Sequence, residues 1–269
     1  MIIDDRAAAE HALNYVGYFR LLIYARQFQL PSNRFRPRCR FSDVYALYEF
    51  DRALRSLCME ATERIEVGLR ATLSNTMALM HGAHWFMDQS HFESFTAHHK
   101  ASGQILISLD RAKSNPAVAH YFSTYSDPSL PPTWLVCQKL SFGALSRLFA
   151  GLKIDRRKKI AQLWGLRENL LASWFRSATT LRNECAHHGR LWNTKLPIDK
   201  PAAHNLFPVD FHAPDSVYAR LCAVKLMLDG LGYGIWFRDS LSCLLLSNPN
   251  VSLSHLAFPS GWESRPLWA

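Results

Sequence analysis

The chain has 269 residues, of which 48% are hydrophobic and 20% charged, with only 12 glycines and 13 prolines. This composition excludes a disordered or low-complexity chain, and the length is sufficient to bury a hydrophobic core. The 31 lysines and arginines exceed the 22 acidic residues and leave a formal net charge of +9 at pH 7. Polyanions, and nucleic acid first among them, are therefore the expected partners.

Helical periodicity dominates the first half of the chain. The first predicted helix covers residues 4–28 and ends before Pro31, which cannot continue a helix. A much longer helix is predicted over residues 43–80, because apolar residues recur there every three or four positions. Ser42 is expected to cap its N-terminus. Another helix is predicted over residues 92–110.

The second half of the chain shows the same periodicity, interrupted by glycines and prolines. Its predicted helices begin at Thr133, after the cap Ser141 and after the cap Asp155, and cover residues 167–187, 215–229 and 233–246. We therefore predict an all-α protein with a single domain over residues 1–269. Its expected parts are an N-terminal helical part (1–125), a basic core (126–250) and an irregular C-terminal tail (251–269).

The sequence contains no sign of a membrane segment, a disulfide framework or a bound cofactor. No uncharged apolar run reaches the roughly 18 residues that cross a membrane, and the acidic start, Met-Ile-Ile-Asp-Asp-Arg, lacks the apolar region of a signal peptide. The six cysteines form no C-x-x-C pair, which favours buried free thiols. His81 and His84 lie one helical turn apart without the ligand spacing of a metal site. We expect a cytoplasmic protein without metal or cofactor.

The positive charge is concentrated in one quarter of the chain. Residues 135–200 contain 13 basic and 4 acidic residues, an excess that equals the whole net charge. The densest run covers residues 156–159, and a second patch alternates arginines with Phe35 and Phe41, which suits phosphate contact combined with base stacking. Either patch can also be an ordinary solvated face. The expected RNA-contacting residues are Lys153, Arg156, Arg157, Lys158, Lys159, Arg176, Arg190, Arg34, Arg36, Arg38 and Arg40.

The helix predicted over residues 167–187 has a polar face inside this basic quarter. At roughly 100° per residue, the face consists of Ser173, Arg176, Thr180, Asn183 and His187. Imidazole can exchange protons with a 2′-hydroxyl near neutral pH, and a guanidinium can stabilise the charge of a phosphorane. His187 and the nearby Arg182 therefore suit metal-free RNA cleavage. A structural alternative stays open, in which His187 caps the helix and Arg182 pairs with Glu184.

The end of this helix also carries a resemblance to a known family. Arg182-Asn183-x-x-x-His187 resembles the R-x4–6-H motif of HEPN ribonucleases. The longer Leu-Arg-Asn-x-Cys-Ala-His-His-x-Arg-Leu-Trp-Asn resembles the AbiD/AbiF-like abortive-infection family of bacteria. Further stretches match the same family in the expected order: Gly17-Tyr18-Phe19-Arg20-Leu21, Tyr48-x-Phe50-Asp51-Arg52-x-Leu54-Arg55, Arg64-Ile65-Glu66, Pro132-x-Trp134, Leu140-Ser141-Phe142-Gly143 and Phe258-Pro259-x-x-Trp262.

The resemblance implies a HEPN-like helical bundle with additional N-terminal helices and an antiviral endoribonuclease that cleaves RNA. It assigns His187 as the acid and base, Arg182 as the group that stabilises the phosphate, and Asn183 as the residue that orients them. His188 is the alternative histidine at R-x5-H spacing. HEPN nucleases pair two motif helices across one cleft, so a single motif implies a homodimer. The family also implies a bound small non-coding RNA.

Two other functions stay open at this point. The motif can anchor phosphate without cutting it, which would make the protein an RNA-binding defence scaffold. Alternatively, the basic quarter can contact an acidic protein; RNA binding that depends steeply on salt would argue against that function. Outside the motif, Asp51 interrupts the apolar stripe of the long helix, and we expect it to form a structural ion pair with an arginine because an unpaired buried carboxylate is costly.

Overall fold

The computed structural model describes the whole chain, residues 1–269, as helices joined by loops, without a β-strand. The α-helices are α1 (Arg6–Tyr15), α2 (Tyr18–Ala25), α3 (Phe41–His81), α4 (Phe95–Arg111), α5 (Pro116–Thr124), α6 (Thr133–Lys139), α7 (Phe142–Gly151), α8 (Ile154–Gln162), α9 (Glu168–Ala186), α10 (Val217–Gly230) and α11 (Gly234–Leu246). Short 3₁₀ helices lie at Arg26–Phe28, Trp85–Met87, Gln89–His91, Pro208–Phe211, Leu253–Leu256 and Trp262–Ser264. The predicted all-α class is confirmed.

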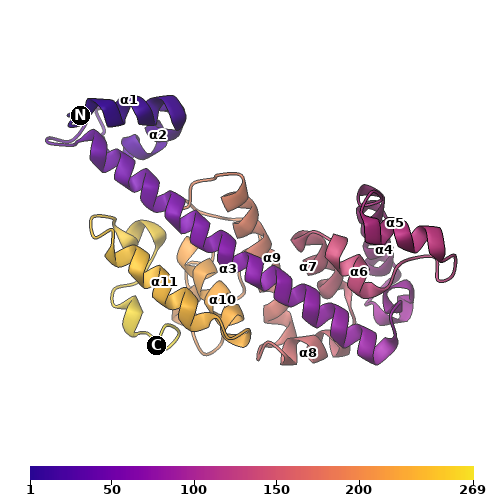
Figure 1. Cartoon of the computed structure of the whole chain (residues 1–269). Helices are drawn as coiled ribbons and strands as arrows, with labels where there is room; N and C mark the ends of the chain where they lie inside the picture. Colours follow the sequence, from indigo (N-terminus) through magenta and orange to yellow (C-terminus); the bar gives the residue numbers. More distant parts are fainter.

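The helix α3 runs through the whole molecule and organises the fold (Figure 1). Its 41 residues correspond to a length of about 60 Å. The helices α6 to α11 all pack against it, with α10 and α11 beside its N-terminal half and α6 beside its C-terminal half (Figure 1). The predicted apolar stripe is buried from Val44 to Met77. The core therefore follows α3 from one end of the molecule to the other.

The N-terminus of α3 differs from the prediction. Ser42 does not cap it; the cap is formed by Asp43, whose carboxylate accepts the backbone N–H of Arg40 at 2.8 Å. Ser42 lies inside the first turn, where its hydroxyl donates to the carboxylate of Asp4. The helix therefore starts two residues earlier than predicted, and its first turn is tied to the start of the chain.

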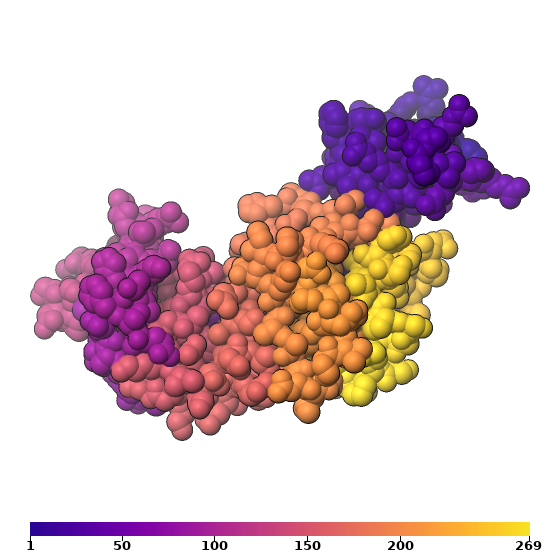
Figure 2. All heavy atoms as spheres, turned by 180° about the vertical axis from the view of Figure 1, so that it is seen from behind, coloured from indigo at the N-terminus to yellow at the C-terminus, as the bar shows by residue number.

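The predicted helix over residues 4–28 is also wrong, because the segment forms two helices. They separate at Gly17, which has φ +93°, a region that favours glycine. The reversal folds α1 and α2 into a lobe at one end of α3, and this lobe protrudes from the body of the molecule (Figure 2). A local backbone turn at one glycine therefore sets the position of the whole N-terminal part.

The predicted helix starts in the second half of the chain are mostly confirmed. α6 begins at Thr133, and the Ser141 hydroxyl caps α7 by accepting the N–H of Ala144 at 3.3 Å. Asp155 is not the cap of α8: the helix begins at Ile154, and Asp155 lies in its first turn. The sequence patterns did not predict α5.

The C-terminal tail packs against the body of the protein. Trp262 and Trp268 are buried, with their rings edge to face at 5.0 Å between centroids. Arg265 pairs with the buried Asp210, which also accepts a hydrogen bond from the hydroxyl of Tyr218 at 2.6 Å. Residues 251–269 therefore add to the core. Among the helices of the structure, none is long and apolar enough to cross a membrane.

Candidate nuclease site at the end of α9

The C-terminal half of α9 separates its residues into the predicted faces. Leu181 and Cys185 are buried in the core, whereas Asn183 and His187 are exposed. Arg182 is half-buried at the boundary between the two faces. The spacing of three and four residues thus turns the polar groups of the motif toward solvent.

The structure brings two of the three predicted catalytic residues into contact. The guanidinium of Arg182 donates a hydrogen bond to the side-chain oxygen of Asn183 at 3.1 Å. His187 is the last residue of the helix turn, and its backbone N–H donates to the carbonyl of Asn183 at 3.0 Å. The imidazole of His187 forms no hydrogen bond with Arg182 or Asn183, and Arg182 forms no ion pair with Glu184. His187 does occupy the helix-capping position of the structural alternative.

α9 ends in a Schellman motif with a histidine in the left-handed position. The N–H of His188 donates to the carbonyl of Cys185 at 3.0 Å, and the N–H of Gly189 donates to that of Glu184 at 2.8 Å. His188 has φ +60°, which usually selects glycine at this place. A side chain held in a strained backbone conformation is a feature of functional sites. His188 is thus a second candidate imidazole.

This strain gives a prediction about stability. Replacing His188 with glycine is expected to raise the free energy of unfolding by about 1 kcal/mol, because glycine adopts a positive φ without a β-carbon clash. His188→Ala keeps the β-carbon and is the matched control, so its stability should equal that of the parent protein. Urea unfolding followed by circular dichroism measures both variants. Equal stability of the glycine and alanine variants would show that the backbone at His188 is not strained.

The loop after the motif is held by the buried carboxylate of Asp51 on α3. This carboxylate pairs with Arg55 and accepts the hydroxyl of Tyr24 on α2 at 2.7 Å. It also accepts the backbone N–H groups of Leu191 at 3.1 Å and Trp192 at 2.7 Å. Burial raises the pKa of Asp51, and the hydrogen bonds act against that rise. The predicted ion pair is confirmed, and it joins α2, α3 and the chain that follows α9.

A groove of about 730 Å³ opens between the N-terminal lobe, α3 and the end of α9. Its lining includes His188 and three arginines, Arg20, Arg52 and Arg55. No aspartate or glutamate lines it. Arg20 donates to the backbone carbonyl of His188 at 2.9 Å, which ties the lobe directly to the motif. Arg52 is exposed and pairs with Glu49 at 2.8 Å. Arg55 is also paired, with the buried Asp51. The groove is therefore an open surface whose cations are partly neutralised, and it reaches the end of the motif.

Arg20, Arg52 and Arg55 are absent from the site residues predicted from the sequence. Arg20, Arg52 and Arg55 lie in stretches that carry the family resemblance, which was the available signal. These arginines lie close to the end of α9 because of contacts between residues more than 130 positions apart in the sequence. The spacing of residues within a single helix could not have predicted these contacts.

The basic run of α8 lies away from the motif. α8 precedes the N-terminus of α9, and the 19 residues of α9 extend about 28 Å to the motif. Arg156 pairs with Asp155, and Arg157 pairs with Glu93 at 3.0 Å, so both guanidinium groups are partly neutralised. The exposed and unpaired cations here are Lys158 and Lys159 in the run and Lys153 just before it.

The remaining predicted RNA-binding residues occupy three places. Arg34, Arg36, Arg38 and Arg40 are exposed in the loop before α3. Phe41 is buried and cannot stack on a base, whereas Phe35 is only partly buried, so base stacking on this loop stays a prediction for Phe35 alone. Arg176 is exposed in the middle of α9.

Arg190 has structural contacts of its own. Its guanidinium donates to the hydroxyl of Thr194 at 3.1 Å and to the carbonyl of Asn193 at 3.3 Å. A third hydrogen bond reaches the carbonyl of Ile23 on α2 at 3.5 Å. The side chain therefore helps to attach the loop after α9 to the N-terminal lobe.

The histidines outside the motif do not form a metal site. The rings of His81 and His91 lie 4.2 Å apart between centroids, and burial lowers the pKa of His91. No group of three or more histidine, cysteine, aspartate or glutamate side chains is arranged to hold a metal ion.

The comparison with known proteins identifies a family whose match covers the segment described above. The Abi-like protein family matches residues 11–193, from α1 to the loop anchored by Asp51. No curated protein and no solved structure matches the chain. The matched segment covers more than half of the chain and contains the motif, the groove and the buried carboxylate that joins them. The chain therefore belongs to the Abi-like protein family, and this membership implies a role in abortive-infection defence against phage.

Proposed function

We propose that the protein is an endoribonuclease of abortive infection that cleaves RNA without a metal ion at the end of α9. The observation that carries the proposal is a pair of exposed histidines, His187 and His188, beside a groove lined by arginines and by no carboxylate. Imidazole is suited to proton transfer near neutral pH, and arginine binds phosphate through several parallel hydrogen bonds. The two kinds of group are those that a metal-independent cleavage of RNA requires.

The proposed reaction is an attack within the RNA strand. The 2′-oxygen forms a bond to the adjacent phosphorus while the bond from phosphorus to the 5′-oxygen breaks. A base removes the proton of the 2′-hydroxyl, and an acid supplies a proton to the leaving 5′-oxygen. The products are a 2′,3′-cyclic phosphate and a 5′-hydroxyl, and side-chain acid and base groups are sufficient for both proton transfers.

We assign the roles within the motif as the resemblance implies. His187 transfers protons, Arg182 stabilises the charge on the phosphorane, and Asn183 orients them. The hydrogen bond between Arg182 and Asn183 supports this assignment, because it fixes the guanidinium relative to the helix. The arginines of the groove, Arg20 and Arg52, would bind neighbouring phosphates of the strand.

The arrangement within one chain supports a homodimer as the active form. The imidazole of His187 and the guanidinium of Arg182 form no hydrogen bond within a single chain. A second motif helix facing the first would bring the histidine of one protomer to the arginine of its partner. The exposed end of α9 leaves room for such a partner.

Mixing two inactive variants tests the shared site. His187→Ala and Arg182→Ala are each expected to lose cleavage, and co-expressed heterodimers should regain part of it, because one of their two composite sites is intact. Size-exclusion chromatography with light scattering establishes the dimer. A mixture as inactive as either variant alone would show that each site belongs to one chain.

A second candidate function is an RNA-binding defence scaffold that does not cleave. It is favoured by the free imidazole of His187, which no hydrogen bond orients for catalysis. The two functions differ in the RNA that the protein carries when it is purified from a bacterial host. Sequencing this RNA, including any small non-coding RNA, and mapping its ends tests the proposal: a nuclease leaves recurrent new ends that vanish with His187→Ala. A scaffold leaves the same ends with either protein.

A further inference from the structure

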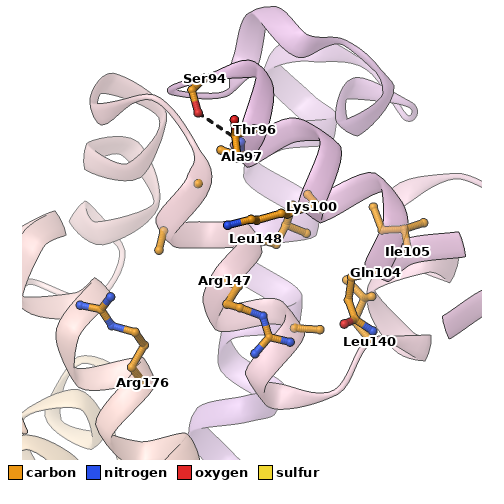
Figure 3. A pocket seen from close by; sticks show the side chains of 14 residues that line it. Ser94, Thr96, Ala97, Lys100, Gln104, Ile105, Leu140, Arg147, Leu148 and Arg176 are labelled. Atoms are coloured by element: carbon orange, nitrogen blue, oxygen red, sulfur yellow. Dashed lines mark hydrogen bonds between the residues drawn. The ribbon is translucent and has the colours of Figure 1, made fainter. Parts of the chain in front are cut away.

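A second basic hollow lies between α4, α7 and α9, at a distance from the groove at the motif (Figure 3). Its volume is about 370 Å³, which lies within the range of about 300–1,000 Å³ typical of ligand sites. Three cations from three helices line it: Lys100 on α4, Arg147 on α7 and Arg176 on α9 (Figure 3). Of these, only Arg176 belongs to the RNA-binding set predicted from the sequence.

The charge of this hollow is not neutralised by the protein. Lys100, Arg147 and Arg176 are exposed, and none of them forms an ion pair or a side-chain hydrogen bond. No aspartate or glutamate is among the 14 lining residues. The arginines of α8 differ in this respect, because acidic neighbours bind them. The hollow therefore offers an anion three cations that no carboxylate of the protein neutralises.

The floor of the hollow is apolar. It is formed by side chains that are at most 3% exposed, namely Ile105, Leu140 and Leu148. An inorganic anion would gain no binding free energy from contact with such an apolar floor. A nucleotide combines a phosphate with a flat base whose faces are apolar, so that both parts of the hollow would be used.

The spread of the cations favours a strand over a single phosphate. Figure 3 shows Lys100 extending from α4 toward α7, with the guanidinium groups of Arg147 and Arg176 on opposite sides of α7. Successive phosphates of a chain can reach separate cations, whereas one phosphate cannot. Arg176 also shares the polar face of α9 with His187, 11 residues earlier and about 17 Å away along the helix axis.

We propose that this hollow binds a single-stranded segment of the RNA that the protein acts on, with phosphates on Lys100 and Arg147 and a base against the apolar floor. A strand held there would continue along α9 toward the motif. The inference rests on the proposed function in one respect, because it takes RNA to be the ligand. It adds a binding subsite that lies outside the motif and the groove.

The test neutralises the hollow and measures how RNA binding depends on salt. The variant is Lys100→Gln combined with Arg147→Gln, in a His187→Ala background that prevents cleavage. The control combines Arg111→Gln with Lys113→Gln, which removes the same charge from the exposed C-terminal end of α4 and the turn just beyond it, where Lys113 pairs with Asp110 on the surface. Fluorescence anisotropy with a labelled oligouridylate of about 12 nucleotides, within the usual site sizes, gives the affinity at several salt concentrations.

Two lost phosphate contacts are expected to reduce the salt slope of the double variant by about 1.4, since each contact with a single strand contributes about 0.7. The control should keep the parent slope. Equal slopes for the variant and the control would overturn the inference and leave the proposed nuclease standing, because His187-dependent cleavage is measured separately. Uridine monophosphate that displaces the oligonucleotide at equal concentration would overturn it in favour of a free nucleotide. A His187→Ala parent that binds no RNA would overturn both.

Discussion

Replacing Asp51 with alanine is expected to lower the free energy of unfolding by about 3–5 kcal/mol, the range for removing one partner of a buried ion pair. The change leaves the charge of Arg55 buried without its partner. It also leaves the backbone N–H groups of Leu191 and Trp192 without an acceptor. Urea unfolding at neutral pH measures the loss.

Glu49→Ala is the matched control for this variant. Glu49 is also a carboxylate on α3 paired with an arginine, Arg52, but the pair is exposed. Removing it should cost less than about 1 kcal/mol, because solvent screens surface ion pairs. Equal losses for Asp51→Ala and Glu49→Ala would contradict the view that the buried carboxylate joins the lobe to the motif loop.

Replacing His187 with alanine is expected to lower the rate of RNA cleavage by about 10²–10⁴-fold, the usual contribution of a general acid or base. Stability should not change, since the side chain is exposed and forms no hydrogen bond. The control is His120→Ala, which removes an exposed histidine from α5. Cleavage of a labelled RNA is measured at equal concentrations of folded protein.

His188→Ala separates the two histidines. His188 lines the groove with the arginines, whereas His187 lies on the polar face with Asn183. We expect the larger loss with His187→Ala and a smaller one with His188→Ala. Full activity of His187→Ala together with an inactive His188→Ala would show that His188, at R-x5-H spacing, is the catalytic histidine.

The sequence predicted those features of the fold that depend on periodicity. The stripe of α3 and the two faces of α9 follow from residues three and four positions apart, and both were predicted correctly. The ion pair of Asp51 was predicted from a single carboxylate in an apolar stripe. An arginine partner was expected because a buried carboxylate without a partner destabilises the fold.

The errors have local or long-range causes. The break at Gly17 depends on the backbone conformation of one residue, which an uninterrupted apolar pattern does not reveal. The choice of Asp43 over Ser42 as the cap of α3 depends on a contact of Ser42 with Asp4, 38 positions earlier. The groove of the motif depends on contacts such as that of Arg20 with His188, across 168 positions. Such contacts arise only when the helices pack.

The distribution of charge along the sequence identified a basic quarter of the chain. It did not show which cations are left without an acidic partner on the folded surface. The run from Arg156 to Lys159 is the densest in the chain, yet two of its four cations are bound by acidic neighbours. Lys100 and Arg147 lie far apart in the sequence, and neither belongs to a run of basic residues. They line one hollow without a single carboxylate, and neither forms an ion pair.

The chemistry of the cut ends tests the central claim most directly. A defined single-stranded RNA is incubated with the protein in excess EDTA, and the products are mapped and treated with phosphatase and with acid. The account predicts cleavage that survives the chelator and leaves 2′,3′-cyclic phosphate and 5′-hydroxyl ends, and that His187→Ala abolishes. Cleavage that requires a divalent ion, or products with 5′-phosphate and 3′-hydroxyl ends, would contradict it.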